Sequence, residues 1–239
     1  MVQASPEGSA WIGELATRYE LPNTAAGALT CLFRSLVGDP QAPTAVRDPV
    51  KVAHDHLADS LVALDLPEVR RANRAVDIGA GAGLPGVPLA IALTHARFVL
   101  LESAARKCAF LTELVARCGL QNASVVHARA ESWPAGLRSF DLATARAVAA
   151  MPVLLEYAAP LLKVGGVLVA WRGRRDLGAE EAAARAALEL GLVSAGVHQV
   201  FPYPTAEHRH LHLWSKVRET PERFPRRPGM ALKRPLAAV

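Results

Sequence analysis

The sequence predicts an α/β fold, in which a mostly parallel seven-stranded sheet follows an N-terminal helical extension. Three observations carry this prediction. Short apolar runs alternate with helical patterns from residue 73 onward, and such alternation is typical of parallel strands joined by right-handed crossovers. A glycine-rich stretch at 79–86 joins the first apolar run to a helical one. The alternation ends in two apolar runs with a short proline-containing loop between them, which predicts an antiparallel strand near one edge of the sheet.

The N-terminal extension, residues 1–70, is predicted to be helical. Apolar side chains recur at helical spacing in two stretches, at Trp11, Leu15 and Tyr19 and again at Leu29, Leu32, Phe33 and Leu36. The stretch 38–43 then breaks the pattern with one glycine and two prolines. A third helix is expected to begin after it, because Asp48 suits an N-cap and Pro49 suits the first helical position.

The central region, residues 71–217, carries the sheet. Its seven predicted strands cover 75–78, 97–101, 123–127, 140–144, 167–171, about 193–201 and 209–217. Helices are predicted between them at 87–93, from 103 to 118, at 152–162 and at 176–190. Ligands of such sheets bind at the carboxyl ends of the strands, near the point where the strand order reverses. Polar residues that follow predicted strands are therefore the candidates for a site.

The last region, residues 218–239, is a basic tail rich in proline and arginine. From Lys216 onward there are seven basic and two acidic residues. The preceding 215 residues hold twenty of each sign, so the net charge of +5 comes entirely from this end of the chain. A cationic segment of this kind suits a polyanion such as RNA, although a tail that only keeps the protein in solution has the same composition.

Composition also limits the class of protein. No apolar run approaches the roughly 20 residues that a membrane helix needs, and the first residues lack the pattern of a signal peptide. The three cysteines, Cys31, Cys108 and Cys118, form no CxxC pair, so we expect reduced thiols and no metal site. These features predict a cytoplasmic protein without a membrane partner.

The glycine-rich stretch has the pattern Asp-x-Gly-x-Gly-x-Gly from Asp77 to Gly83. A loop of glycines lets a ligand approach the bare backbone and meet the N–H groups of the following helix. Gly81, Gly83 and Gly86 also fit the dinucleotide fingerprint, which alone is a weak signal. An acid at the end of the strand would repel a pyrophosphate but suits a ligand with an ammonium and a sulfonium group. The stretch therefore predicts a Rossmann-like class I S-adenosylmethionine-dependent methyltransferase, with Asp77, Gly79 and Gly81 at the cofactor.

Four further residues follow predicted strands and complete the candidate site. Glu102 ends the second strand and could accept both ribose hydroxyls of the cofactor, a role that NAD would also require. Ala130 and Glu131 follow the third strand, where the adenine would lie. Arg146 ends the fourth strand, so it would face the transferred methyl group and is the candidate catalytic residue. An arginine among apolar neighbours needs a partner, because an unpaired buried charge is costly.

Motifs that are missing after the predicted strands limit which atom could accept the methyl group. The Asn/Asp-Pro-Pro-aromatic box, common in enzymes that methylate exocyclic amines, is absent after the fourth strand. No cysteine lies near a predicted strand end, which argues against methylation of a pyrimidine C5 through a covalent step. N7 of guanine is a free acceptor on the base edge, and its methylation needs orientation rather than a general base. Arg146 suits that task.

Several segments resemble the RsmG family, also called GidB, of small-subunit (16S) ribosomal RNA guanine-N7 methyltransferases. They are Asp77–Pro88, Leu101–Leu111, Ala130-Glu131, Ser139–Ala149 and Arg209-His210-Leu211, together with Val46-Arg47-Asp48-Pro49 and His56-x-x-Asp59-Ser60 in the helical region. The resemblance implies methylation of N7 of a guanine in 16S rRNA. It also implies which residues contact S-adenosylmethionine, namely Gly79, Leu84, Ala130, Glu131 and Arg146.

Two alternative functions stay open. A methyltransferase of the same fold could act on a small molecule, and an RNA-binding module could retain a vestigial pocket. The basic tail argues against the first, and the complete set of acids and glycines argues against the second. We therefore expect an enzyme with S-adenosylmethionine as cofactor and small-subunit ribosomal RNA, free or within a ribosomal subunit, as partner. We also expect a monomer, with Arg47, Arg172, Arg209 and the tail on RNA phosphates.

Overall fold

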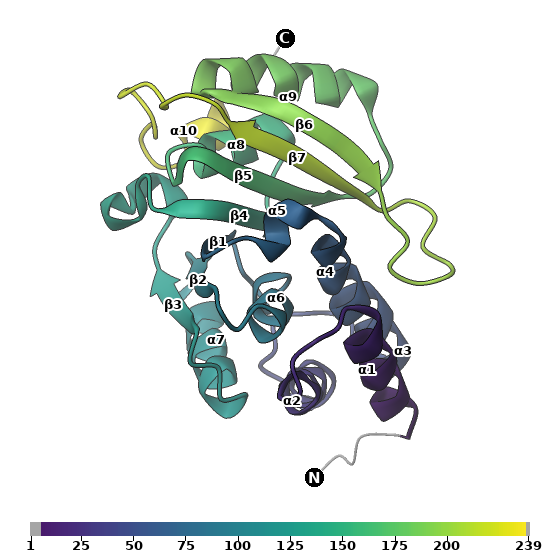
Figure 1. Cartoon of the computed structure of the whole chain (residues 1–239). Helices are drawn as coiled ribbons and strands as arrows, with labels where there is room; N and C mark the ends of the chain where they lie inside the picture. Colours follow the sequence, from purple (N-terminus) through teal and green to yellow (C-terminus); the bar gives the residue numbers. More distant parts are fainter. Residues whose placement is uncertain (1–5, 238–239) are drawn as a thin grey trace.

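The computed structural model describes residues 6–237 and is built on one seven-stranded sheet (Figure 1). The strands are β1 (Arg74–Ile78), β2 (Arg97–Glu102), β3 (Ala123–His127), β4 (Phe140–Arg146), β5 (Leu162–Arg172), β6 (Leu192–Gln199) and β7 (His210–Lys216). Their order across the sheet is β3-β2-β1-β4-β5-β7-β6. The first five run parallel, and β7 lies antiparallel to both β5 and β6. The predicted mostly parallel sheet with an antiparallel strand near one edge is confirmed.

Helices cover both faces of the sheet (Figure 1). One face carries the N-terminal helices with α6 (Gly86–Ala92) and α7 (Ala105–Arg117), and the other carries α8 (Met151–Ala158) and α9 (Leu177–Leu190). Buried side chains form one apolar cluster on each face. Ala75 and Val76 of β1 belong to opposite clusters, because successive side chains of a strand point to opposite faces. This double burial explains why the central strands are apolar on both faces.

The N-terminal region is helical, as the spacing of its apolar residues predicts. Helix α1 (Pro6–Arg18) is followed by α2 (Ala25–Gly38). A third helical run begins at Pro49, where the Oδ1 atom of Asp48 accepts the N–H of Lys51 at 2.9 Å. This run consists of α3 (Pro49–Lys51), the π-helical segment η1 (Val52–Ala58), α4 (Asp59–Leu61), the 3₁₀ turn η2 (Val62–Asp65) and α5 (Pro67–Arg70).

The π-helical segment differs from the regular helix that the sequence predicts, and its contacts supply the reason. The carbonyl of Asp55 accepts a hydrogen bond from Nη1 of Arg146 at 2.7 Å. Just beyond the segment, the carbonyl of Asp59 accepts one from the indole N–H of Trp171, also at 2.7 Å. Side chains from β4 and β5 therefore bond to carbonyls of this widened run. Such widened turns occur frequently at functional sites.

One further prediction needs correction, and the structure of the tail was not predicted. Helix α8 ends at Ala158 rather than at residue 162, because Pro160 has no N–H with which to continue the helix. The chain instead enters β5 at Leu162. The basic tail is packed against the protein and contains a short helix, α10 (Met230–Lys233), beside α8 (Figure 1). Phe224 and Ala231 of the tail are buried in the apolar cluster beneath α8 and α9.

The N-terminal helices and one face of the sheet share a single apolar cluster. The division into an extension at 1–70, a central region at 71–217 and a tail at 218–239 stays a prediction. Within residues 6–237, no helix has the length and apolar character needed to cross a membrane.

Candidate functional site

The glycine-rich loop lies between β1 and α6, at the carboxyl end of β1. The N–H groups of Gly79 and Ala80 donate to the carbonyl of Leu101 at 2.8 and 3.1 Å, which ties the start of the loop to β2. Gly79 has a φ of +68°, and a Cβ atom there would lie 2.9 Å from the side chain of Val148. Both the left-handed conformation and this close approach require glycine. The loop therefore brings bare backbone to the edge of the sheet.

Asp77 lies beneath this loop rather than at its open side. Its Oδ2 atom accepts the N–H of Gly86 at 2.9 Å, and its Oδ1 atom accepts the hydroxyl of Thr144 at 2.8 Å. Complete burial raises the pKa of Asp77 to about 7, although both hydrogen bonds favour the charged form. A Cβ on Gly86 would lie 2.7 Å from the carboxylate, so glycine lets the helix start approach it. Asp77 therefore holds the start of α6 to β1 and β4, and its place at the cofactor stays a prediction.

Glu102, at the end of β2, holds the other side of the loop. Its Oε2 atom accepts the N–H of Gly81 at 3.1 Å, and its Oε1 atom accepts the N–H groups of Ser103 and Ala104, both at 2.8 Å. The side chain is buried. A carboxylate offers about four acceptor positions, so these three bonds leave capacity for one more donor, such as a ribose hydroxyl.

A pocket of about 180 Å³ opens beside Gly79. It lies at the carboxyl ends of the strands and is lined by Ile78, Gly79, Leu101, Ser103, Ala128, Arg129, Ala130, Glu131, Val148, Ala149, Tyr157 and Leu232. The predicted residues Gly79, Ala130 and Glu131 therefore meet in one place. Carboxyl ends of parallel strands are where open α/β sheets bind ligands.

The remaining predicted residues lie outside this pocket lining. Gly81 lies next to Glu102 through the hydrogen bond described above, and Leu84 is buried in the apolar cluster below the loop. Arg146 points toward the N-terminal helices. Its Nη1 atom donates to Oδ2 of Asp59 at 3.0 Å, and its Nη2 atom lies 3.4 Å from Nδ1 of His56.

Arg146 belongs to a polar network that the sequence reasoning missed. The buried Asp59 also lies 3.5 Å from Nε of Arg209, and burial raises the pKa of Asp59. Arg209 donates to Asp55 at 2.9 Å, and the hydroxyl of Tyr203 donates to the same carboxylate. Burial alone would raise the pKa of Asp55, but the hydrogen bonds from Tyr203 and Arg209 lower it. The sequence feature that could have indicated this network is Arg146 itself, because a half-buried guanidinium requires an acidic partner.

Arg209, described above, was expected on RNA phosphates and instead bonds to acids of the protein. Two further arginines with the same expected role, Arg47 and Arg172, also make bonds within the protein. Arg47 donates to the carbonyls of Leu36, Asp39 and Ala42 at 2.9, 2.5 and 2.9 Å, which fixes the chain after α2. Arg172 donates to the carbonyl of Ala149 at 2.7 Å. These bonds give both side chains a structural task.

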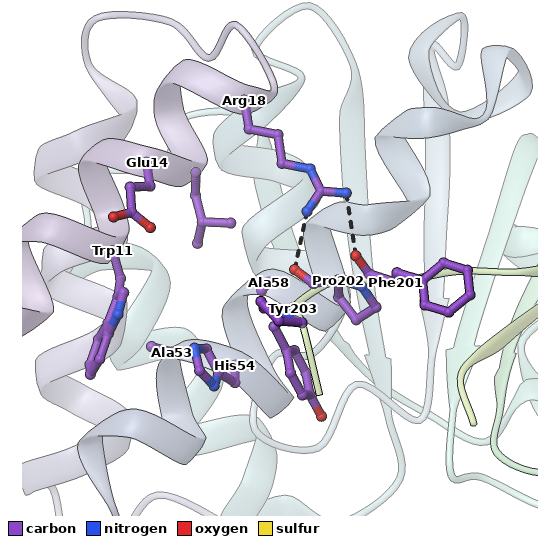
Figure 2. Close-up of a pocket in the computed structure, with 11 residues that line it drawn as sticks. Trp11, Glu14, Arg18, Ala53, His54, Ala58, Phe201, Pro202 and Tyr203 are labelled. Atoms are coloured by element: carbon purple, nitrogen blue, oxygen red, sulfur yellow. Dashed lines mark hydrogen bonds between the residues drawn. The ribbon is translucent and has the colours of Figure 1, made fainter. Parts of the chain in front are cut away.

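A second, larger hollow lies between α1, the π-helical segment and the loop after β6 (Figure 2). Its volume is about 390 Å³. The rings of His54 and Tyr203 stack at 4.8 Å, and the ring of Trp11 lies 5.7 Å from His54. Arg18 closes one end by donating to the carbonyls of residues 201 and 202 (Figure 2). None of the predicted cofactor residues lines this hollow, so its greater size does not make it the candidate site.

Three or more His, Cys, Asp or Glu side chains do not gather in a metal-binding arrangement anywhere in the described part of the chain. The absence of a metal from the functional protein stays a prediction.

The fold matches solved methyltransferase structures. An S-adenosylmethionine-dependent methyltransferase from Aquifex aeolicus is 17% identical with a TM-score of 0.56, over 71% of this chain and 94% of that one. Aeropyrum pernix fibrillarin, solved with natively bound S-adenosyl-L-methionine, is 16% identical with a TM-score of 0.53, over 65% and 72%. The sheet order and the glycine loop thus define a Rossmann-like fold of the S-adenosylmethionine-dependent methyltransferase class.

The sequence identifies the family more narrowly. The family described as rRNA small subunit methyltransferase G (GidB) matches residues 41–211. A protein of that name from Rubrobacter xylanophilus is 43% identical over 80% of this chain and 75% of its own length. Another from Pelotomaculum thermopropionicum is 38% identical over 81% and 82%. The chain belongs to the GidB family, which confirms the resemblance found in the sequence motifs.

Proposed function

We propose that this protein transfers a methyl group from S-adenosylmethionine to N7 of a guanine in small-subunit (16S) ribosomal RNA. The observation that carries the proposal is the pocket beside Gly79, lined also by Ala130 and Glu131, in a chain of the GidB family. The relatives are named for methylation of small-subunit rRNA. The preference for N7 of guanine rests on the family resemblance and on the chemistry of the strand ends.

The residues that line the pocket and those next to it suit S-adenosylmethionine. Gly79 lines the pocket with bare backbone, so the methionine part could approach it closely. Glu102 retains acceptor capacity for a ribose hydroxyl, and Glu131 offers a carboxylate where the adenine amine would lie. When bound, S-adenosylmethionine supplies an electrophilic methyl group. Gly81 in the loop is bonded to Glu102, and Asp77 of β1 holds the backbone of Gly86 beneath the loop.

Arg146 is the residue that we assign to the acceptor base. Asp59 and the carbonyl of Asp55 hold its guanidinium at 3.0 and 2.7 Å, so a fixed positive charge lies at the end of β4. N7 of guanine has a free lone pair, and a fixed cation favours binding of the O6 edge beside it. No proton has to be removed before transfer, so orientation of the base is the main task of this side.

Contacts to RNA phosphates are assigned to the exposed cations of the tail. Arg227, Lys233 and Arg234 are exposed and flank or belong to α10, whose Leu232 lines the pocket. Phosphate contacts made by lysine and arginine weaken steeply with added salt. A ribosomal RNA substrate agrees with the cytoplasmic location that the sequence predicts, and the monomeric state remains an expectation of the same proposal.

The proposal is tested by transfer of labelled methyl from S-adenosylmethionine to small ribosomal subunits that lack the modification, and in parallel to bare 16S rRNA. Chemical cleavage at 7-methylguanine then maps the product. A single cleavage in 16S rRNA is expected. Binding of the cofactor without transfer to either substrate would refute the assigned acceptor, and a chain that fails to bind the cofactor would refute the assigned pocket.

A further inference from the structure

The end of the chain borders the candidate cofactor pocket. We call residues 221–237 the C-terminal strap. The N–H of Gly229, within the strap, donates to Oε1 of Glu131 at 3.0 Å. Three residues further on, Leu232 of α10 lines the same pocket as Gly79 and Glu131. A segment far from the glycine loop in sequence therefore forms part of the pocket.

The strap is held in place by buried contacts of its own. Phe224 and Ala231 belong to the apolar cluster beneath α8 and α9. Arg226 makes two hydrogen bonds to the carboxylate of Glu156, a residue of α8 that is completely buried. Arg226 also donates to the carbonyl of Arg234 at 2.9 Å, which joins the two ends of the strap. These contacts fix the position of the strap without help from a ligand.

Just before the strap, Lys216 secures its starting point. Its buried Nζ atom donates to the carbonyls of Ala159 and Leu190 at 2.8 and 3.1 Å, and to the hydroxyl of Thr220. Burial lowers the pKa of Lys216 to about 8. The chain therefore leaves β7 in one defined direction, toward α8 and the pocket.

Leu232 has the placement of a side chain that covers an apolar ligand. Its neighbour Ala231 is buried, whereas Leu232 is 57% exposed at the edge of the pocket. An exposed leucine gains favourable burial when a flat apolar group packs on it. With the strap in place the pocket measures about 180 Å³, below the range of about 300 to 1,000 Å³ common for whole drug-sized ligands. This space suits part of a ligand, such as a purine ring.

The hydrogen bond from Gly229 holds the carboxylate of Glu131, the polar group at the edge of the same pocket. One N–H occupies one acceptor position of the Glu131 carboxylate, which has several. The remaining positions can accept an exocyclic amine. The bond from the strap limits the rotation of the carboxylate, so less freedom is lost when a ligand binds.

We propose that the C-terminal strap is the outer wall of the adenine end of the cofactor site. Leu232 covers the purine ring, and Gly229 is a positioning residue that orients Glu131 toward the purine amine. This inference rests on the proposed function, because it assumes that the pocket beside Gly79 binds S-adenosylmethionine. It gives the tail a task in cofactor binding that its charge alone does not indicate.

The test is the affinity of the full chain for S-adenosylhomocysteine, measured by calorimetry. Leu232→Ala is expected to weaken binding by about tenfold, and Leu232→Met is expected to restore most of the loss. The matched control is Leu177→Ala, because Leu177 is also a helical leucine, is 68% exposed and does not line the pocket. It should leave the affinity unchanged. Both alanine variants remove exposed side chains, so both should unfold at the same temperature as the unaltered chain.

The possible failures are distinguishable. An affinity of Leu232→Ala equal to that of the unaltered chain would show that the strap is not part of the site, and the proposed function would stand. Tighter binding by Leu232→Ala would show that the strap blocks the pocket, which also overturns the inference. Absence of binding by the unaltered chain would overturn the cofactor assignment itself and the inference with it.

Discussion

Asp77 is the buried carboxylate on which the glycine loop rests, and its replacement by asparagine should change how stability depends on pH. Burial raises the pKa of Asp77 in the folded protein from 3.8 to about 7. Between these values the folded state binds more protons than the unfolded state, so this group makes the protein less stable as the pH rises. The difference corresponds to at most about 4 kcal/mol in the free energy of unfolding. Asp77→Asn should remove this loss.

Asparagine suits the site because it can keep both hydrogen bonds. Its amide oxygen can accept the N–H of Gly86, and its amide nitrogen can donate to the hydroxyl of Thr144, which rotates to accept. The free energy of unfolding is measured by urea titration at several pH values between about 4 and 8. The variant should gain stability over the unaltered chain as the pH rises through this range. Other titrating groups cancel in the comparison.

The control is Asp48→Asn, at an exposed helix N-cap. Asparagine caps helices as well as aspartate does, so this variant should follow the unaltered chain across the pH range. If Asp77→Asn and the unaltered chain also gave parallel curves, burial would not be raising the pKa of Asp77. The carboxylate beneath the loop would then be charged in the folded protein throughout this range.

Three other changes test the site and its surroundings. Gly79→Val should abolish binding of S-adenosylhomocysteine in calorimetry, whereas Gly119→Val, at the same φ of +68° but with open space around it, should leave it unchanged. Arg146→Ala should lower the free energy of unfolding by about 3 kcal/mol, because the buried Asp59 loses its nearest cation; an unchanged urea midpoint would contradict this. His212→Phe should remove a loss of stability below pH 6.5, because burial lowers the pKa of His212 to about 4 and the unfolded chain then takes up the proton first; thermal unfolding at several pH values measures it.

Much of the fold could be predicted from the sequence because its signals are local. Apolar runs of strand length and the glycines at 79–86 mark the sheet and the loop wherever the rest of the chain lies. The π-helical segment carries no such signal. Its backbone carbonyl at Asp55 bonds to Arg146, which lies 91 positions away. A contact of that range can be inferred only when both partners have been placed.

In the candidate site too, the sequence predicts where residues follow strands but not which residues they contact. Gly79, Ala130 and Glu131 were predicted from their places after strands, and they line one pocket. The place of Asp77 was also predicted, but its partners were not. Its carboxylate meets Gly86 and Thr144 because β4 pairs with β1 in a register that sets Thr144 beside it. Register between parallel strands depends on the whole sheet, so the sequence alone does not show that Thr144 is a partner of Asp77.

The basic residues of the tail have two different roles, which the composition alone does not separate. The charge of the tail predicts contact with a polyanion, but the cations are divided in the structure. Arg223 and Arg226 pair with glutamates of α9 and α8, and Arg218 donates to a carbonyl of α9, so these three side chains bind the tail to the protein. Arg227, Lys233 and Arg234 are exposed as well, and they lie on or beside α10. Part of the positive charge that the sequence assigns to the whole tail is therefore presented by the segment of the strap that borders the pocket.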